Sequence, residues 1–436
     1  MSRILVLGAG FVAGPLVKYL TGKDHQITVA SQFLAEAQAI ADDFPTISIS
    51  ELNVADEDSL GVLVAEHDLT ISFVPYQFHV NVANQCIKYS KHMITASYEF
   101  PEMKALHQQA IDNDVCILNE IGLDPGIDHL SAMQMIDSIN ENGGTLKSFV
   151  SWCGGLPAPS SNNNPLGYKF AWAPKSVLLA LLNNATFLKA GEVVTVDAEQ
   201  LLENVQKVTL SSGMELEGYP NRDSVSYRDI YGLDDADEVF RGTLRYPGFS
   251  EILQCCKELG LLDQNTNLEL DANASISWKS LLENNVTNLE QLLSNKSELV
   301  NDAIIWLGLL DSNQTVGNAN SMIDAFCQLL IEKLSYAEDE VDMVVLQHEL
   351  ISINAQGMKE VRHSTLILEG DSDGYSAMAK TVGTPAAIAA DLILSGVIED
   401  RGVVLPMSSG IYTPILAALE EQGIKLDESL ITEKID

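Results

Sequence analysis

Small residues near the start of the chain are spaced to hold a dinucleotide. Gly8, Ala9 and Gly10 separate an apolar run, RILVL, from a helix-like run, VAGPLVKYL. Gly8 permits a tight turn, Gly10 lets the backbone approach a pyrophosphate, and Ala13 takes the third position of G-x-G-x-x-G/A. The helix N-terminus then faces the phosphates. A glycine-rich turn without a ligand would have the same local pattern, but the alternation of strands and helices that follows favours the dinucleotide. We predict cofactor contacts from Gly8, Ala9, Gly10, Phe11, Val12, Ser31, Gln32, Asn53, Val54, Val74 and Ser97.

A group of arginines in the middle of an acidic chain suggests the chemistry of the substrate. The group consists of Arg222, Arg228, Arg241 and Arg245. Arginine binds carboxylates through paired N–H groups, so such a group suits a small molecule with several carboxylates. The alternative is that these side chains form surface ion pairs with nearby acids, for example Arg241 with Glu238. We favour that alternative for Arg228 and Arg241.

Charge and composition limit the partners of the chain. A formal charge of -36 over 436 residues opposes binding to nucleic acid and to anionic membranes. The N-terminus has the pattern of a β-strand rather than a signal peptide, and we find no apolar run of membrane-spanning length. The six cysteines include no C-x-x-C pair and show no metal-ligand spacing. We therefore expect a cytoplasmic protein that acts on a small molecule and holds no metal.

The elements that must position these residues alternate regularly in the first part of the chain. Strand-like runs, with helix-like runs between them, cover 3–8, 26–31, 46–53, 69–75, 92–97 and 115–120. Such alternation predicts a doubly wound parallel sheet of the Rossmann type over residues 1–124. The candidate residues follow the carboxyl ends of these strands, where the ligand crevice of such a sheet lies.

The pattern changes beyond this point. Asp124 and Pro125 resemble a helix N-cap and its first residue. A strand over 146–155 follows, and two strand-like runs near the end are joined by Ala-Gln-Gly-Met, which predicts a hairpin. We expect a mixed α/β domain for substrate binding and dimerisation over 125–247 and 338–436, with a helical subdomain at 248–337 inserted into it. Part of the C-terminal tail could return to the Rossmann domain.

Motifs along nearly the whole chain resemble the saccharopine dehydrogenase family, in its NADP-dependent, L-glutamate-forming branch. They are GAGFVAGP, NEIGLDPGIDH, CGGLPAP, NPLGYKF, YPNRDS, RGTLRY, VVLQH and GYSAMAKTVG. The resemblance implies reversible hydride transfer between NADP(H) and the secondary amine of saccharopine. Hydrolysis of the resulting imine would give L-glutamate and α-aminoadipate semialdehyde, an activity of lysine metabolism. It also implies a homodimer.

The resemblance also implies roles for individual residues. Asp124, Cys153 and Tyr98 would handle protons, and the substrate would contact Ser97, Tyr98, Asp124, Arg222, Thr243, Leu244 and Arg245. Each has a structural alternative. As a helix N-cap alone, Asp124 would have a depressed pKa and be a poor base. Cys153 and Tyr98 could serve only in packing. The histidines, among them His79, His129, His348 and His363, are expected to be structural.

The chain departs from the family at the end of the second strand. Gln32 stands where the family usually has an arginine for the 2′-phosphate of NADP, and the acid typical of NAD binding is missing as well. Ser31 and Gln32 can still donate hydrogen bonds. We expect NADP(H) to be preferred by a reduced margin, with NAD(H) possible.

Other functions remain open at this point. A related dehydrogenase could act on another amino-acid or polyamine conjugate, of the carboxynorspermidine or lysine-ε type. A polyamine conjugate would require more acids and fewer arginines than YPNRDS and RGTLRY provide. A dinucleotide-binding regulatory or scaffold protein without turnover is the non-enzyme alternative, which the joint presence of the proposed catalytic and substrate-binding residues disfavours.

Overall fold

The computed structural model describes residues 1–210, 212–266, 268 and 276–434. The chain forms two compact units, each made of several segments. The first unit contains Met1–Thr145, Asn354–Met358 and Gly374–Ser429. The second contains Leu146–Ile353, Lys359–Asp373 and Leu430–Asp436.

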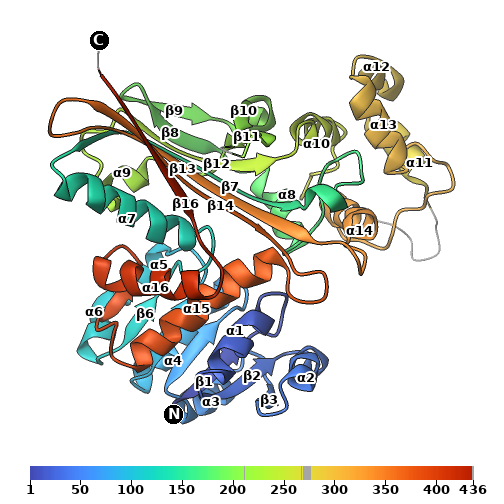
Figure 1. The fold of residues 1–436 in the computed structure, drawn as a ribbon. Coiled ribbons are helices and arrows are strands. Elements are labelled where there is room, and N and C mark those ends of the chain that lie inside the picture. The colour runs from blue at the N-terminus through green and yellow to red at the C-terminus, as the bar shows by residue number, and fades with distance from the viewer. Residues whose placement is uncertain (211, 267, 269–275, 435–436) are drawn as a thin grey trace. The chain divides into compact units, whose positions relative to one another are not determined.

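The first unit is built on a seven-stranded sheet of the predicted Rossmann type (Figure 1). The strand order is β15-β6-β5-β4-β1-β2-β3, and every pair is parallel. The strands are β1 (Arg3–Leu7), β2 (Gln26–Ser31), β3 (Ser48–Glu51), β4 (Leu69–Ser72), β5 (His92–Thr95), β6 (Cys116–Leu118) and β15 (Gly402–Val404). Strand β1 is buried along four consecutive residues, as expected for a central parallel strand covered on both faces. The sequence pattern predicted all of these strands except β15, which the C-terminal part of the chain adds next to β6.

The helices of the first unit connect these strands and cover the sheet. They are α1 (Ala13–Thr21), α2 (Leu34–Asp43), α3 (Glu57–Glu66), the short 3-10 helix η1 (Tyr76–Phe78), α4 (His79–Lys88), α5 (Pro101–Lys104), α6 (His107–Asp112), α7 (Ile127–Glu141), α15 (Ala377–Leu394) and α16 (Ser409–Glu421). Helix α3 begins as capping rules predict, because the Asp56 carboxylate accepts a hydrogen bond from the Ser59 amide.

Helix α15 lies against α1, beside the glycine-rich turn (Figure 1). A Cβ atom on Gly383 would stand 2.3 Å from the carbonyl oxygen of Val12, so only glycine allows this approach. A Cβ atom on Gly14 would likewise meet the Tyr375 ring. The helix, at 18 residues with a mean hydropathy of 1.3, is long and apolar enough to cross a membrane, so the expectation of no such run was wrong. By burial it is a core helix, with 72% of that length inside the fold.

A nine-stranded mixed sheet forms the second unit, as predicted. The order is β10-β11-β12-β7-β13-β14-β16, while β8 pairs with β12 and β9. The strands are β7 (Thr145–Pro157), β8 (Ala185–Lys189), β9 (Glu192–Val196), β10 (Gln206–Thr209), β11 (Glu215–Pro220), β12 (Glu238–Arg245), β13 (Asp342–Ile353), β14 (Lys359–Glu369) and β16 (Asp427–Glu433). Strands β13 and β14 form the predicted antiparallel hairpin, which closes with Ile353 opposite Lys359.

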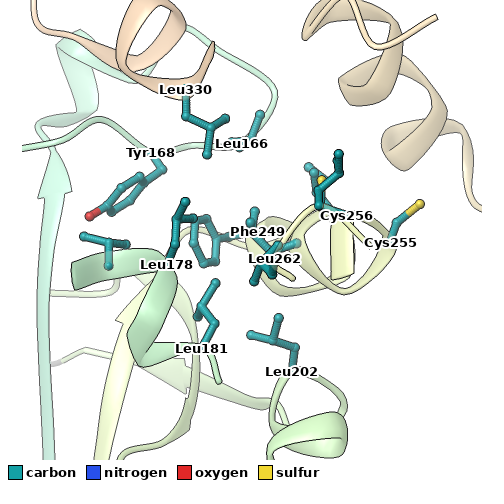
Figure 2. Packing of buried hydrophobic residues seen from close by; sticks show 14 of the residues in the cluster. Leu166, Tyr168, Leu178, Leu181, Leu202, Phe249, Cys255, Cys256, Leu262 and Leu330 are labelled. Carbon is teal, nitrogen blue, oxygen red and sulfur yellow. The ribbon is translucent and has the colours of Figure 1, made fainter. Parts of the chain in front are cut away.

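The helices of the second unit gather around a large apolar core. They are the 3-10 helices η2 (Pro159–Ser161) and η3 (Ala198–Glu203), with α8 (Pro174–Ala180), α9 (Ser226–Ile230), α10 (Phe249–Glu258), α11 (Trp278–Asn285), α12 (Leu289–Ser294), α13 (Glu298–Trp306) and α14 (Met322–Leu334). Figure 2 shows Phe249 of α10, Leu178 of α8 and Leu330 of α14 in this core. The predicted helical character of the segment from 248 to 337 is confirmed for its described residues. The domain boundaries stay a proposal.

Candidate functional site

The glycine-rich turn after β1 has the geometry of a phosphate-binding loop. Gly8 has a φ of +101°, and a Cβ atom on it would lie 3.1 Å from the Phe73 carbonyl oxygen. This position therefore requires glycine for folding. Gly10 differs, because a Cβ atom there would meet nothing within 4 Å. The open space at Gly10 and the start of α1 at Ala13 fit a pyrophosphate at the helix N-terminus.

The other predicted cofactor residues line the carboxyl-end edge of the same sheet. The side chain of Phe11 is 77% exposed beside the turn. The Asn53 side chain accepts a hydrogen bond from the Ala55 amide, and the Val54 carbonyl oxygen accepts one from Asn81. These contacts fix the loop after β3. Val74 follows β4 and is half-buried. The residues present thus fit a dinucleotide on this edge.

The end of β2 differs from the expectation. The Ser31 hydroxyl is buried and donates a 2.9 Å hydrogen bond to Oε2 of Glu36, while its oxygen accepts from the Phe33 amide. Gln32 is exposed. Glu36 was not among the predicted residues, because the acid typical of NAD binding is expected at the strand end and Glu36 lies in the helix that follows.

Ser97, which follows β5, belongs to a buried polar network. Its hydroxyl lies 2.8 Å from Nε2 of His79, whose Nδ1 lies 3.0 Å from the Ser72 hydroxyl. The Thr95 hydroxyl lies 3.2 Å from the same Nε2. His79 is 1% exposed, and burial lowers its pKa to about 4, so the ring is neutral near pH 7. The structural role of His79 is therefore to hold the Ser97 hydroxyl through a hydrogen bond.

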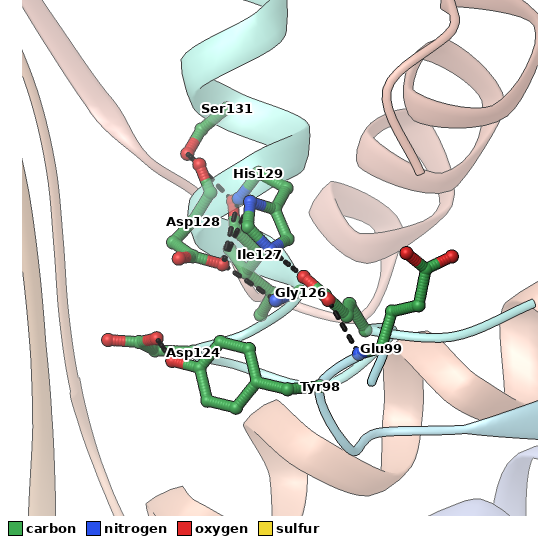
Figure 3. Close-up of polar contacts among 9 residues, drawn as sticks. Tyr98, Glu99, Asp124, Gly126, Ile127, Asp128, His129 and Ser131 are labelled. Atoms are coloured by element: carbon green, nitrogen blue, oxygen red, sulfur yellow. Dashed lines mark hydrogen bonds and ion pairs between the residues drawn. The ribbon is translucent and has the colours of Figure 1, made fainter. Parts of the chain in front are cut away.

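Tyr98 and Asp124 come together in the first unit (Figure 3). The Tyr98 hydroxyl donates a 2.7 Å hydrogen bond to Oδ1 of Asp124, and both side chains are half-buried. A phenol and a carboxylate in contact can orient one another and pass a proton to a bound group. The structure therefore unites two of the three predicted proton-handling residues.

The prediction that Asp124 caps the following helix was wrong. Helix α7 begins at Ile127, and Asp128 satisfies its first amides by accepting hydrogen bonds from Gly126 and His129. The Asp124–Pro125 peptide that precedes the helix is cis. The purely capping role proposed as an alternative for Asp124 is excluded.

A buried hydrogen-bonded pair anchors the loop that carries Asp124 (Figure 3). Nε2 of His129 lies 2.7 Å from Oε2 of Glu120, and both residues are buried. The other carboxylate oxygen of Glu120 accepts a hydrogen bond from the Glu99 amide, next to Tyr98. This pair links the strand ends of β5 and β6 to α7.

In the second unit, Cys153 and Thr243 are direct neighbours on parallel strands. They face each other in the β7–β12 register, and both are half-buried. Because side chains alternate along a strand, Thr243 and Arg245 share one face of β12. The Leu244 side chain lies on the other face, fully buried in the core. Only the Leu244 backbone is therefore left for a ligand, and its carbonyl oxygen already accepts from Nη1 of Arg245.

Arg245 is a buried cation surrounded by aromatic rings. It is 5% exposed, and its guanidinium carbon lies 4.9 Å, 5.2 Å and 5.9 Å from the ring centres of Tyr168, Phe249 and Tyr219. Among the described residues no acceptor is found for its Nε. The nearest carboxylate in strand register, Glu217, accepts hydrogen bonds from the amides that start α10 instead. A buried cation without an acid partner is costly unless an anion joins it.

The other arginines of the group have different environments. Arg222 is exposed, with a φ of +49° at the turn after β11. Arg241 is 3% exposed and stacks 4.2 Å from the Tyr227 ring centre, so it does not lie at the surface, where its ion pair was expected. Glu238, its proposed partner, accepts a hydrogen bond from Ser148. Arg228 donates to the carbonyl oxygen of Asp234 rather than to an acid.

Family comparisons match both parts of the chain. Residues 4–118 match the saccharopine dehydrogenase NADP binding domain, and residues 122–424 match the saccharopine dehydrogenase C-terminal domain. The chain belongs to the saccharopine dehydrogenase family. Its relatives include saccharopine dehydrogenase [NADP(+), L-glutamate-forming] of Schizosaccharomyces pombe, with 39% identity over 100% of both chains. The enzyme of the same name from Saccharomyces cerevisiae is 39% identical over 99% of both chains.

A solved structure and a longer relative extend this comparison. The solved structure of apo saccharopine dehydrogenase (L-Glu forming) from Saccharomyces cerevisiae has a TM-score of 0.89 and 37% identity, and covers 99% of this chain and 100% of its own. The mitochondrial alpha-aminoadipic semialdehyde synthase of Rattus norvegicus is 40% identical over 97% of this chain, which spans 47% of that protein. Across the described residues no group of histidine, cysteine and acidic side chains could hold a metal ion.

Proposed function

We propose that this chain is an NADP-dependent, L-glutamate-forming saccharopine dehydrogenase. It would oxidise the secondary amine of saccharopine, and hydrolysis of the imine would give L-glutamate and α-aminoadipate semialdehyde in lysine metabolism. The observation that carries the proposal is the end-to-end match to the Schizosaccharomyces pombe enzyme of that name. Bound NADP⁺ would supply the hydride acceptor.

The proposed roles divide between the two units. In the first, the turn from Gly8 to Val12 binds the pyrophosphate, and Asp124 takes up the proton of the attacking water and returns it to the nitrogen of the leaving L-glutamate. Tyr98 orients the Asp124 carboxylate, and its 2.7 Å hydrogen bond supports this role. Ser97, held by His79, contacts the cofactor and the substrate.

Substrate carboxylates are assigned to the second unit. Arg245 is the principal carboxylate-binding residue, because its buried guanidinium lacks an acid partner within the described chain. Arg222, exposed at its turn, is the second. Thr243 and the Leu244 backbone complete the contacts, and the Cys153 thiol is the remaining proton-handling candidate. A polyamine conjugate such as carboxynorspermidine carries fewer carboxylates than saccharopine and would leave one of these arginines without an anion.

A spectrophotometric assay tests the proposal. NADPH should be oxidised when L-glutamate and α-aminoadipate semialdehyde are both present, and not when either is omitted. No activity is expected when glutamate is replaced by other amino acids. None is expected when the pair is replaced by the amine and aldehyde precursors of carboxynorspermidine. Turnover with a different amine and aldehyde pair would instead support the related-dehydrogenase alternative.

We also propose that the protein acts as a cytoplasmic homodimer without nucleic acid or membrane partners. The net charge of -36 supports the exclusion of anionic partners. Strand β16 lies at the edge of the second sheet, with Leu430 and Ile431 about half exposed, and such an edge suits pairing with another copy. Light scattering coupled to gel filtration would distinguish a dimer from a monomer.

A further inference from the structure

The carboxylate of Glu36 occupies the end of β2, where this fold meets the adenosine ribose of a dinucleotide. Its Oε2 accepts a 2.9 Å hydrogen bond from the buried Ser31 hydroxyl. The Ser31 oxygen also accepts from the Phe33 amide at 3.2 Å. The donor of Ser31 is therefore committed to an acid, and Glu36 is fixed near the strand end although it follows Ser31 by five residues.

The local structure explains this position. Helix α2 begins at Leu34, directly after the short connection of Gln32 and Phe33, so its first turn lies over the strand end. Glu36 is in that turn, where the positive end of the helix dipole stabilises an acidic side chain. Glu36 remains exposed to solvent, and so its carboxylate is accessible to a ligand.

No cation balances this acid within the connection. The segment from Ser31 to Ala37 reads SQFLAEA and contains neither lysine nor arginine. A carboxylate at this place accepts a hydrogen bond from the 2′-hydroxyl of NAD(H), whereas it repels the 2′-phosphate of NADP(H). To bind that phosphate, Ser31 must also release Glu36 or share its single donor.

We infer that Glu36 is a cofactor-specificity residue, which weakens binding of NADP(H) and supports binding of NAD(H), so that this chain accepts both. The inference rests on the proposed function only in assuming a dinucleotide on this sheet edge. It replaces the expectation that no acid serves the ribose. Gln32 then acts as a neutral donor beside an acid rather than as the main determinant.

Direct binding tests this assignment without turnover. NADPH and NADH are titrated into the intact protein, and the ratio of their dissociation constants is measured for wild type, Glu36→Gln and Asp42→Asn. Asp42 is the matched control, because it carries the same charge on α2 but at the far end of the helix, where it accepts from Gln38. Circular dichroism checks that each variant is folded.

We expect Glu36→Gln to tighten NADPH about five- to twentyfold, from loss of charge repulsion and release of Ser31, and to leave NADH unchanged or weaker. The gain should shrink at high salt, since the carboxylate is exposed. Asp42→Asn should leave the ratio unchanged. A ratio that changes less than about twofold in Glu36→Gln, or equally in both variants, overturns the inference.

A second pair of variants gives an independent result. Gln32→Arg alone should tighten NADPH binding less than an arginine without a neighbouring carboxylate would, because Glu36 can pair with the new guanidinium. In the double variant with Glu36→Gln, the gain in free energy of NADPH binding should then exceed the sum of the gains from the two single variants. Strict additivity contradicts the inference. A wild-type chain that binds neither nucleotide overturns the proposed function as well, whereas binding of both with an unaffected ratio overturns the inference alone.

Discussion

The phenol of Tyr98 donates a hydrogen bond to the carboxylate of Asp124 over 2.7 Å. These residues follow different strands, β5 and β6, and the loop of Asp124 is anchored by the buried pair of Glu120 and His129. The carboxylate is thus positioned from outside the helix that follows it. Since Asp124 does not cap α7, its replacement reports on chemistry rather than on helix formation.

Asp124→Asn should lower kcat by about a hundredfold or more, because an amide cannot take up the proton that a carboxylate accepts. The unfolding temperature should change little, since Asp128 supplies the contacts that start α7. The variant should also lose one limb of the pH profile of kcat. Tyr98→Phe, which removes only the orienting hydroxyl, should have a smaller effect. Wild-type kcat in Asp124→Asn would exclude Asp124 as the proton-handling residue and leave Cys153 as the candidate.

Arg245→Met should raise the KM for saccharopine about ten- to several-hundredfold, the scale of ~1.5–3 kcal/mol for a hydrogen bond to a charged group. The KM for NADP⁺ should hardly change. Because methionine fills the aromatic cradle without an unpaired charge, thermal stability should be retained or increased. Arg228→Ala is the control, since within the described residues that side chain donates to a loop carbonyl oxygen rather than to an acid. Unchanged KM in Arg245→Met would exclude Arg245 from substrate binding.

Gly10→Val should abolish dinucleotide binding and leave the fold intact, because a side chain there meets nothing in the protein but occupies the place of the pyrophosphate. Gly8→Val should instead damage folding, through its positive φ and the nearby Phe73 carbonyl. Calorimetric titration with NADPH and thermal unfolding separate these outcomes. Wild-type affinity in a folded Gly10→Val protein would refute the phosphate-binding assignment.

The buried His79 should make stability depend on pH. Burial lowers its pKa from 6.5 to about 4, so the folded state binds fewer protons than the unfolded state between these values. The stability it contributes is therefore present above pH 6.5 and is lost as pH falls toward 4, by about 2 kcal/mol between pH 7 and pH 5. Scanning calorimetry should show that the difference in unfolding free energy between wild type and His79→Gln becomes smaller over that pH interval. A constant difference would contradict the assignment.

Local patterns in the sequence predicted the first unit well. The strand, Gly8 and the start of α1 follow from neighbouring residues, and the buried strands of a parallel sheet have continuous apolar runs. Strands β8 to β12 were not predicted. Most of them are short, and although β8–β9 and β10–β11 are local hairpins, β12 joins the sheet by pairing with β7 across a long sequence distance. Strand β15 was missed for the same reason, since only its partner β6, far back in the chain, defines it.

The candidate site was predicted less completely. The role of Asp124 could not be predicted, because either Asp124 or Asp128 could accept hydrogen bonds from the first amides of α7. In the structure Asp128 accepts them. Glu36 was missed because the turn of a helix, rather than sequence spacing, returns it to Ser31. The burial of Arg245 could not be read from its surroundings in the sequence, since Tyr168 and Tyr219, which cover it together with the nearby Phe249, come from separate segments.

Hydride transfer between NADP(H) and saccharopine is the reaction that defines the proposed function. The most direct test supplies NADPH that carries deuterium at the transferable nicotinamide position, together with L-glutamate and α-aminoadipate semialdehyde, and analyses the product by mass spectrometry. We expect wild type, but not Gly10→Val, to form saccharopine that contains one deuterium on a carbon attached to the secondary amine. Oxidation of NADPH without labelled saccharopine, or no oxidation by a protein that binds NADPH, would contradict the proposed function.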